Sequence, residues 1–145
     1  MNSQQQSGFL ISKIHHLGSR IFARMLKEYK IEINPAQGRI MFVLWQEDDL
    51  PIRELARRTA LEKSTLTGML DRLEKMGYVR RIPSADDRRE ILVERTAQDR
   101  YLQGIYVKVS QEMSRLFYMG FSKSENDELD GYLRRLLANL EERVE

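Results

Sequence analysis

No cysteine occurs among the 145 residues of this chain. The absence excludes disulfide bonds, thiolate metal sites and redox sensing by cysteine. The two histidines, His15 and His16, are adjacent. Neighbouring side chains point about 100° apart on a helix, so these two do not converge on one metal ion. We therefore expect no metal site and no bound cofactor.

Long apolar runs are absent as well, because no stretch approaches the roughly 20 residues that a membrane span needs. The polar segment 1–8 lacks the basic and apolar parts of a signal peptide, and we expect it to be a disordered tail. Catalytic patterns such as a glycine-rich phosphate loop or a nucleophile elbow are missing too. These absences predict a cytoplasmic protein that contacts no membrane and is not an enzyme.

The chain does contain a concentration of basic charge in its middle. The net charge of the whole chain is only +2, but residues 51–95 hold eleven basic and eight acidic side chains and so carry +3. The remaining residues sum to −1. Most of the central bases are arginines, a distribution that fits a nucleic-acid footprint.

Helical periodicity dominates the sequence and predicts a mainly α fold. Apolar residues spaced three and four apart predict one long helix over 9–29. Asn34 and Pro35, followed by Gln37, form the capping pattern that starts a second helix. Inward-facing apolar residues then continue to about Trp45, where we expect this helix to end.

The centre of the chain is predicted to hold two short helices and a β-hairpin. A helix opened by Pro51 and a helix over 64–76 are separated by a tight turn, a spacing typical of DNA-binding helix-turn-helix units. Gly77 is placed to end the second helix in a left-handed conformation. Residues 78–82 and 91–93 are β-rich and flank a turn, which predicts a small hairpin wing.

Two further helices are expected after this hairpin. Thr96 is predicted to cap the first, with Asp99 in its first turn, and Ser122 with Glu125 forms a capping box for the second. Leucines recur every three or four residues in the last helix. Such a stripe beside a long first helix favours a subunit interface over packing within one monomer, which is the alternative. The residues assigned to this dimer interface are Leu10, Ile14, Leu129, Leu133, Leu136 and Leu140.

The helix over 64–76 has two distinct faces. The side expected to be buried carries Leu66, Leu70 and Leu73. Short polar residues on the other side let a backbone approach DNA and offer hydroxyl groups to phosphates or base edges. The alternative is an ordinary solvated face, but the paired arginines Arg88 and Arg89 at the hairpin tip favour DNA. Asp87 beside them is expected to orient a guanidinium group.

These segments resemble the multiple-antibiotic-resistance regulator (MarR) family of winged helix-turn-helix proteins, in order and spacing from about Phe9 onward. The matching text consists of Asn34-Pro35-Ala36-Gln37, Glu54-Leu55-Ala56, Ser64-Thr65-Leu66-Thr67, Asp71-Arg72-Leu73-Glu74-Lys75-Met76-Gly77-Tyr78-Val79, and Asp87-Arg88-Arg89 with Thr96. The resemblance implies a homodimer that binds an inverted repeat in double-stranded DNA, with one helix in the major groove and a wing arginine in the minor groove. It also implies transcriptional control, usually repression that a small molecule relieves.

The resemblance divides the chain into four segments. These are a tail at 1–8, a dimerisation helix at 9–34, a winged helix-turn-helix DNA-binding domain at 35–95, and dimerisation helices at 96–145. The residues implied to contact DNA are Arg53, Lys63, Ser64, Thr65, Thr67, Gly68, Arg72, Arg88 and Arg89. Asp87 is implied to support the wing.

Three residues depart from the family pattern. Gly68 stands where relatives often carry a larger, basic residue, and Ser84 stands where they often have a first wing aspartate. Both departures bear on which operator sequence is read. Arg95 replaces the leucine usual before Thr96, which predicts different packing where the wing meets the next helix.

Small-molecule effectors of this family often occupy a crevice between the dimer helices and the DNA-binding lobe. A small aromatic or lipophilic effector is therefore expected here. The residues assigned to its pocket are His15, His16, Tyr29, Trp45 and Tyr106. The alternative for each of them is ordinary packing or a place on the surface.

A protein-interaction adaptor is the alternative function, because winged helices also serve in that role. The small residues Ser64, Thr65 and Gly68 favour DNA, since the core of a protein interface is expected to hold Trp or Tyr. A steep loss of binding with salt would distinguish DNA binding from the adaptor.

Overall fold

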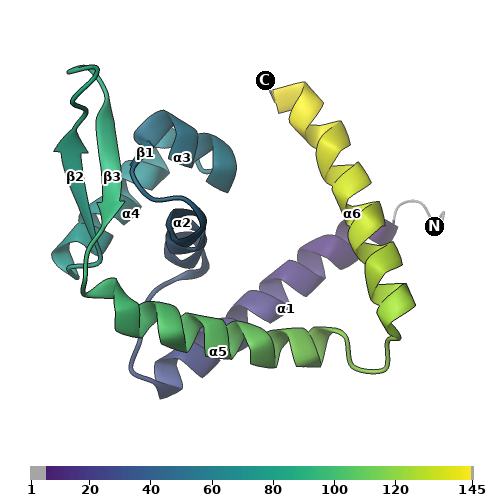
Figure 1. The fold of residues 1–145 in the computed structure, drawn as a ribbon. Coiled ribbons are helices and arrows are strands. Elements are labelled where there is room, and N and C mark those ends of the chain that lie inside the picture. The colour runs from purple at the N-terminus through teal and green to yellow at the C-terminus, as the bar shows by residue number, and fades with distance from the viewer. Residues whose placement is uncertain (1–5, 145) are drawn as a thin grey trace. The chain divides into compact units, whose positions relative to one another are not determined.

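Six helices and three short strands follow one another along residues 6–144, the part of the chain that the computed structural model describes. The helices are α1 (Gln6–Glu28), α2 (Pro35–Gln46), α3 (Ile52–Thr59), α4 (Lys63–Lys75), α5 (Asp99–Phe117) and α6 (Lys123–Val144). The strands are β1 (Leu50–Pro51), β2 (Val79–Pro83) and β3 (Ile91–Arg95) (Figure 1). A mainly α fold with a small β-hairpin is therefore confirmed.

The chain forms two units, Met1–Ser110 and Gln111–Glu145. The core of the first unit includes the apolar stripe of α4. Leu66, Leu70 and Leu73 are fully buried, as expected, and join Leu55 of α3 in one apolar cluster. Burying a leucine side chain contributes about 1.5–3 kcal/mol to stability. The other face of α4 is exposed, so the core determines which residues of this helix are presented to solvent.

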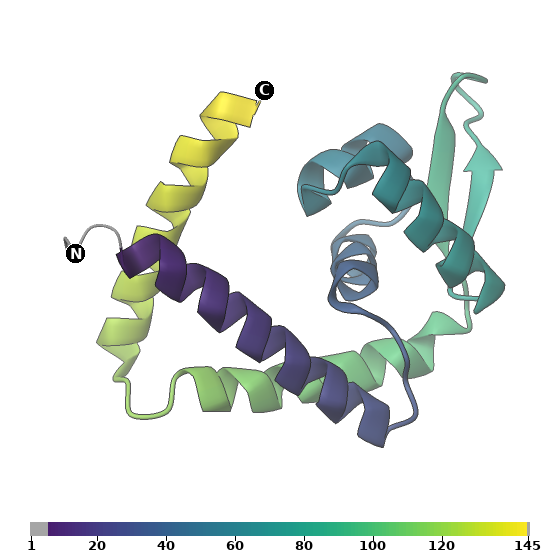
Figure 2. The same cartoon turned by 180° about the vertical axis from the view of Figure 1, so that it is seen from behind.

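The strands form one antiparallel sheet in the order β1-β3-β2. β2 and β3 pair along their full length as the expected hairpin, and Figure 2 shows α4 leading directly into it. The sequence did not predict β1, which adds Leu50 opposite Val93 and Pro51 opposite Leu92. Two residues are too few to show strand alternation. Proline fits this place because β1 is an edge strand.

Two capping boxes start helices as the sequence predicts. In α2, the N–H of Gln37 donates to Oδ1 of Asn34 at 2.8 Å, and the N–H of Asn34 donates to Oε1 of Gln37 at 2.9 Å. Before α6, Ser122 and Glu125 exchange the same two bonds at 3.1 and 2.8 Å. Each box satisfies two backbone donors that a helix start otherwise leaves open.

Gly77 ends α4 as expected, with φ at +85°. The N–H of Tyr78 donates to the carbonyl of Leu73 and the N–H of Gly77 donates to that of Glu74, both at 3.0 Å. These are the two bonds of a Schellman cap. A Cβ atom at position 77 would also meet the flexible end of the Gln98 side chain, which would have to move. Glycine is therefore required chiefly by the left-handed backbone that ends α4.

The first helix begins earlier than the sequence predicts. α1 starts at Gln6, so residues 6–8 are helical and do not belong to a tail. Residues 1–5 of the expected tail lie outside the described residues. A short polar segment has no apolar spacing, and periodicity could not indicate this first turn.

Thr96 does not cap α5, and this expectation is wrong. Its hydroxyl donates to the carbonyl of Gly77, and its N–H donates to the carbonyl of Tyr78 at 3.2 Å. α5 begins three residues later, at Asp99. A threonine hydroxyl can serve a helix end or a neighbouring backbone segment, and sequence spacing alone does not distinguish the two.

The second unit contains the end of α5 and all of α6. None of the described residues of α6 is buried. Of its leucine stripe, Leu133 is 42% and Leu136 is 46% exposed, and Leu129 is half-buried. Within residues 6–144, no helix combines the length and apolar character required to cross a membrane.

Candidate nucleic-acid interface

α4 presents a face of small polar side chains. Ser64, Thr65 and Gly68 are exposed on it. A Cβ atom added to Gly68 would meet no atom within 4 Å, so this part of the helix surface is open. Short side chains on an exposed helix allow its backbone to come close to the edges of bases in the major groove.

Thr67 is exposed on the same helix, but its hydroxyl hydrogen is already used. Oγ1 donates to the carbonyl of Lys63, one turn earlier, at 2.9 Å. The methyl group and an oxygen lone pair remain for an outside partner. In this geometry Thr67 can accept a hydrogen bond or make an apolar contact with DNA, but its hydroxyl hydrogen is not free to be donated to DNA.

Ser84 organises the wing loop between β2 and β3. Its Oγ accepts the N–H of Asp86 at 3.2 Å and that of Asp87 at 3.3 Å. Its own N–H donates to the carbonyl of Glu90 at 3.0 Å. Serine hydroxyls form such turns as aspartate does. The departure from the family pattern at Ser84 therefore keeps a turn-forming side chain in the loop.

Asp87 contacts the wing backbone. Its Oδ1 accepts the N–H of Arg89 at 3.0 Å. The ion pairs within residues 6–144 include none between Asp87 and the guanidinium of Arg88 or Arg89, so the expectation that this carboxylate orients a guanidinium is wrong. Asp87 instead fixes the loop from which both arginines project.

The arginines of residues 51–95 fall into two groups. Six of them form ion pairs with carboxylates: Arg53, Arg57, Arg58, Arg80, Arg81 and Arg95. The other three, Arg72, Arg88 and Arg89, are exposed and have no carboxylate partner in the part of the chain that is described. These three lie on α4 and on the wing loop. Uncompensated positive charge is therefore concentrated on the two elements that the resemblance assigns to DNA.

Arg53, expected to contact phosphate, forms an ion pair with a carboxylate of its own chain. Its Nε lies 2.6 Å from Oε1 of Glu90, which connects α3 to the wing loop. The hydrogen bond with Glu90, and then the charge of that carboxylate, raise the pKa of Arg53. The Arg53 side chain is still 75% exposed. The sequence analysis missed Glu90, because no local pattern links two residues 37 positions apart.

Asp99 is the centre of a buried polar cluster. Its Oδ2 accepts the indole N–H of Trp45 at 2.9 Å and Nε–H of Arg95 at 2.7 Å. The guanidinium of Arg95 donates also to Oδ1 of Asp99 at 3.1 Å and to Gln103 at 2.7 Å. The hydrogen bond with Asp99 raises the pKa of Arg95. The cluster joins the end of β3 to α2 and α5, so the unusual Arg95 is matched by a buried partner.

The residues expected to form an effector pocket have different surroundings. Trp45 and Tyr106 make an edge-to-face contact with ring centroids 5.1 Å apart, and burial raises the pKa of Tyr106. The ammonium nitrogen of Lys108 lies over the ring of Tyr29, 5.4 Å from the ring centroid. The two histidines are exposed on α1. Over residues 6–144, no cluster of histidine and acidic side chains could hold a metal ion.

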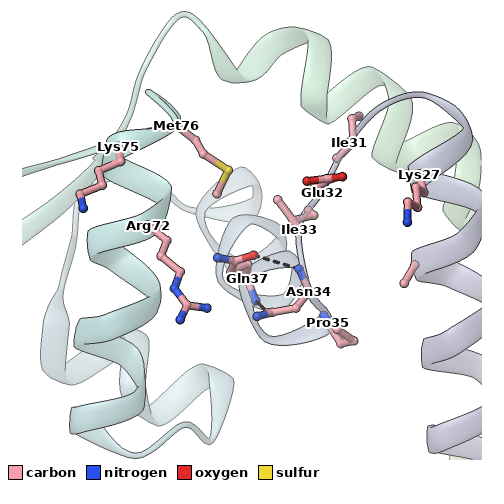
Figure 3. A pocket seen from close by; sticks show the side chains of 11 residues that line it. Lys27, Ile31, Glu32, Ile33, Asn34, Pro35, Gln37, Arg72, Lys75 and Met76 are labelled. Atoms are coloured by element: carbon pink, nitrogen blue, oxygen red, sulfur yellow. Dashed lines mark hydrogen bonds between the residues drawn. The ribbon is translucent and has the colours of Figure 1, made fainter.

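A cavity of about 650 Å³ lies beside the end of α4 (Figure 3). Its walls come from α1, from the segment 31–35, from the start of α2 and from Arg72, Lys75 and Met76 of the α4 end. None of the five residues expected to bind an effector lines it. The sequence analysis missed this cavity, because its walls combine residues 23–37 with residues 72–76, which are distant in sequence.

Helices α3 and α4, the tight turn between them and the hairpin that follows define a winged helix-turn-helix. The exposed polar face of α4 and the arginines of the wing loop lie on its two reading elements. This architecture places the chain in a class of proteins that present one helix and one β-hairpin to a partner.

Comparison with known proteins identifies the family. Residues 33–91 match the model of the MarR family. The HTH-type transcriptional regulator TtmR of Methylorubrum extorquens (strain PA1) is 32% identical to this chain over 66% of its residues and 48% of TtmR. The chain thus spans about half the length of that curated relative. Residues 33–91 of this protein are therefore a MarR-family domain.

Two solved structures share the fold. A mutant of MarR from E. coli, complexed with operator DNA, has a TM-score of 0.80 and 24% identity and covers 90% of this chain and 92% of its own. The structure of BpsR from Bordetella bronchiseptica, described with the regulation of its DNA binding by 6-hydroxynicotinic acid, has a TM-score of 0.82 and 20% identity over 94% and 96% of the two chains. Likeness at this level of identity establishes the architecture.

Proposed function

We propose that this protein is a homodimeric, sequence-specific DNA-binding transcriptional regulator. The observation that carries the proposal is the separation of the arginines. Arg72, Arg88 and Arg89 are exposed and lack a carboxylate partner within residues 6–144, whereas the six other arginines of residues 51–95 are paired. Uncompensated guanidinium groups suit phosphates and the negative potential of a narrow minor groove.

In the proposed complex, α4 lies in the major groove. Ser64 and Thr65 reach phosphates or base edges, and Arg72 reaches a phosphate or a guanine. Gly68 lets the helix backbone approach the DNA, and the methyl group of Thr67 is available to a thymine methyl group.

The wing loop lies against the minor groove in the same scheme. Arg88 and Arg89 provide the contacts there, and Asp87 holds the loop backbone beneath them. Lys63 at the start of α4 and Arg53 on α3 contact phosphates. Because Arg53 is paired with Glu90, its phosphate contact also connects the wing loop to the DNA backbone.

The dimer is proposed to use the apolar faces of α1 and α6. The residues assigned to it are Leu10, Ile14, Leu129, Leu133, Leu136 and Leu140. Two-fold symmetry then presents two copies of α4 to two half-sites of an inverted repeat. The E. coli protein of the same fold was solved in complex with operator DNA, which supports DNA as the partner.

We also propose that the protein is a repressor and that a small molecule releases it from DNA. The ligand named with the Bordetella relative supports this mode of control. The curated relatives are transcriptional regulators of bacteria, in which chromosomal DNA lies in the cytoplasm, and we propose the same location for this protein.

The test begins with selection of binding sites from randomised duplex DNA at two salt concentrations. Enrichment of an inverted repeat supports a symmetric dimer that reads sequence. Arg89→Ala is then expected to weaken binding to that repeat about tenfold and to reduce the salt slope by about one unit. Arg80→Ala is the matched control, because Arg80 lies on β2 and pairs with Glu94 at 2.9 Å. Its affinity should change less than about twofold.

Two results would contradict the proposal. Equal DNA affinity of wild type and Arg89→Ala would remove the wing from the interface. Failure to enrich any motif, with weak binding that is insensitive to salt, would favour the protein-interaction adaptor.

A further inference from the structure

A nearly buried amide group points into the cavity beside α4 (Figure 3). Gln37 is only 4% exposed. Its Oε1 accepts the N–H of Asn34, but its Nε2 donates to no acceptor among residues 6–144. Nε2 faces the side of the cavity where Arg72 and Met76 lie. Nε2 reaches the accessible surface of the cavity and is therefore available to a ligand.

Positive side chains stand on opposite sides of the same cavity. Lys27 comes from α1, and Arg72 and Lys75 come from α4. Glu32 is the acidic residue of the lining, which leaves an excess of positive charge. Neither Lys27 nor Arg72 pairs with a carboxylate in the described chain. The charged lining therefore favours an anion of low charge.

The rest of the lining is largely aliphatic. Ala23, Ile31, Ile33, Pro35 and Met76 supply the apolar wall, and no aromatic ring takes part in it. A flat ring would find no stacking partner there, whereas a flexible hydrocarbon chain contacts such a wall well. The volume of about 650 Å³ lies within the range of about 300–1,000 Å³ typical of small-molecule sites.

We propose that this cavity binds an aliphatic monocarboxylate of medium chain length. The carboxylate accepts a hydrogen bond from Nε2 of Gln37 and pairs with Arg72, while Lys27 contributes long-range attraction. The hydrocarbon chain lies along Ile33 and Met76. The site is separate from Trp45, Tyr106 and the other residues to which the sequence assigned an effector.

Arg72 connects this cavity to the proposed DNA surface, and this step rests on the proposed function. A guanidinium that pairs with a bound carboxylate no longer neutralises a phosphate of DNA. Occupancy of the cavity therefore lowers DNA affinity by competition for one side chain. By linkage, DNA lowers the affinity for the carboxylate by the same factor.

The test is isothermal titration calorimetry of the full chain with decanoate, below the concentration at which it forms micelles. Decanoate is expected to bind once per chain, and decanol, its neutral counterpart, at least tenfold more weakly. Gln37→Glu should weaken decanoate binding at least tenfold. Glutamate keeps the acceptor for the N–H of Asn34, and with it the capping box, but it replaces the donor by a negative charge.

A second set of variants leaves the capping box untouched. Lys27→Gln should weaken decanoate binding about threefold, and Glu32→Gln should strengthen it by a similar factor. Lys13→Gln is the matched control, because Lys13 is exposed on the same helix and does not line the cavity. Its affinity should equal that of wild type.

Absence of decanoate binding would overturn the proposal, and so would equal affinity for decanol or an affinity unchanged by both Gln37→Glu and Lys27→Gln. A fluorescence anisotropy titration with the selected operator tests the link to DNA. Operator affinity that decanoate leaves unchanged, although it binds, would overturn the shared role of Arg72. If the protein binds no DNA, the proposed function fails, and calorimetry still decides whether the cavity takes the carboxylate.

Discussion

Helices α4 and α6 carry leucines at similar spacing but differ in what covers them. Leu66 and Leu70 of α4 are fully buried within the first unit, whereas Leu133 and Leu136 of α6 are nearly half exposed within the second. Both stripes satisfy the same periodicity rule. The comparison teaches that leucine spacing identifies an apolar helix face that has to be buried. Whether the face is already buried in the single chain then tells whether the chain itself or another molecule must bury it.

Truncation in the α4 stripe tests the intramolecular side of this comparison. Leu70→Ala should lower the free energy of unfolding by about 2–5 kcal/mol, because it removes apolar contacts and leaves a cavity. Urea denaturation followed by circular dichroism measures the loss. Gly68→Ala on the exposed face is the control and should stabilise by about 0.5–1 kcal/mol, since the added methyl group meets no atom. A loss below about 0.5 kcal/mol for Leu70→Ala would contradict the assignment of this stripe to the core.

A charge placed in the α6 stripe tests the intermolecular side. Leu136→Lys should raise the dissociation constant of the proposed dimer about a hundredfold, because a lysine ammonium group would have to be desolvated at the interface. Sedimentation equilibrium measures the constant. Ala138→Lys adds the same charge about 160° away around the helix from Leu136 and should leave the dimer intact. A Leu136→Lys variant that remains dimeric would place the interface elsewhere.

The smallest effect concerns an exposed ion pair on α3. Hydrogen bonds from Arg57 and then from Arg58 lower the pKa of Glu54 to about 2 from an ordinary 4.5. The folded state binds this proton less readily than the unfolded state, so the stabilisation is complete above pH 4.5 and is lost as the pH falls towards 2.

Thermal melts between pH 6 and pH 2 check this expectation. Wild type should exceed Glu54→Gln in melting temperature near neutral pH, and the difference should shrink as acid protonates Glu54. Salt should reduce the difference, because the pair is exposed. Glu112→Gln, at a partly exposed position on α5, serves as the control. A difference between wild type and Glu54→Gln that stays constant over the whole range would show that the carboxylate charge is not its source.

Local signals predicted most of the fold. The capping box of Asn34 and Gln37 and the turn at Gly77 involve residues within a few positions of each other, so the sequence contains the whole interaction. Thr96 was misassigned because its partner, the carbonyl of Gly77, lies 19 residues away. β1 was missed because its two residues become a strand only by pairing with β3.

The candidate nucleic-acid interface also combines features that local sequence predicts with features that depend on distant residues. The exposed face of α4 follows from helical spacing, but the pairing of Arg53 with Glu90 and the cavity at Gln37 depend on contacts distant in sequence. The back-bond of Thr67 to Lys63 is a local pattern that could have been recognised. The DNA contacts themselves stay predictions until the selection and the arginine variants are measured.

The buried cluster around Asp99 determines how long a segment must be exchanged as one piece when a chimera with a relative is made. A wing exchanged with that of a relative and cut after β3 would separate Arg95 from Asp99, whose exposed fraction is only 1%. A buried carboxylate that loses its cation costs about 3–5 kcal/mol. A working graft therefore continues through Gln103 and retains Trp45, so the exchangeable cassette is longer than the hairpin it is meant to replace.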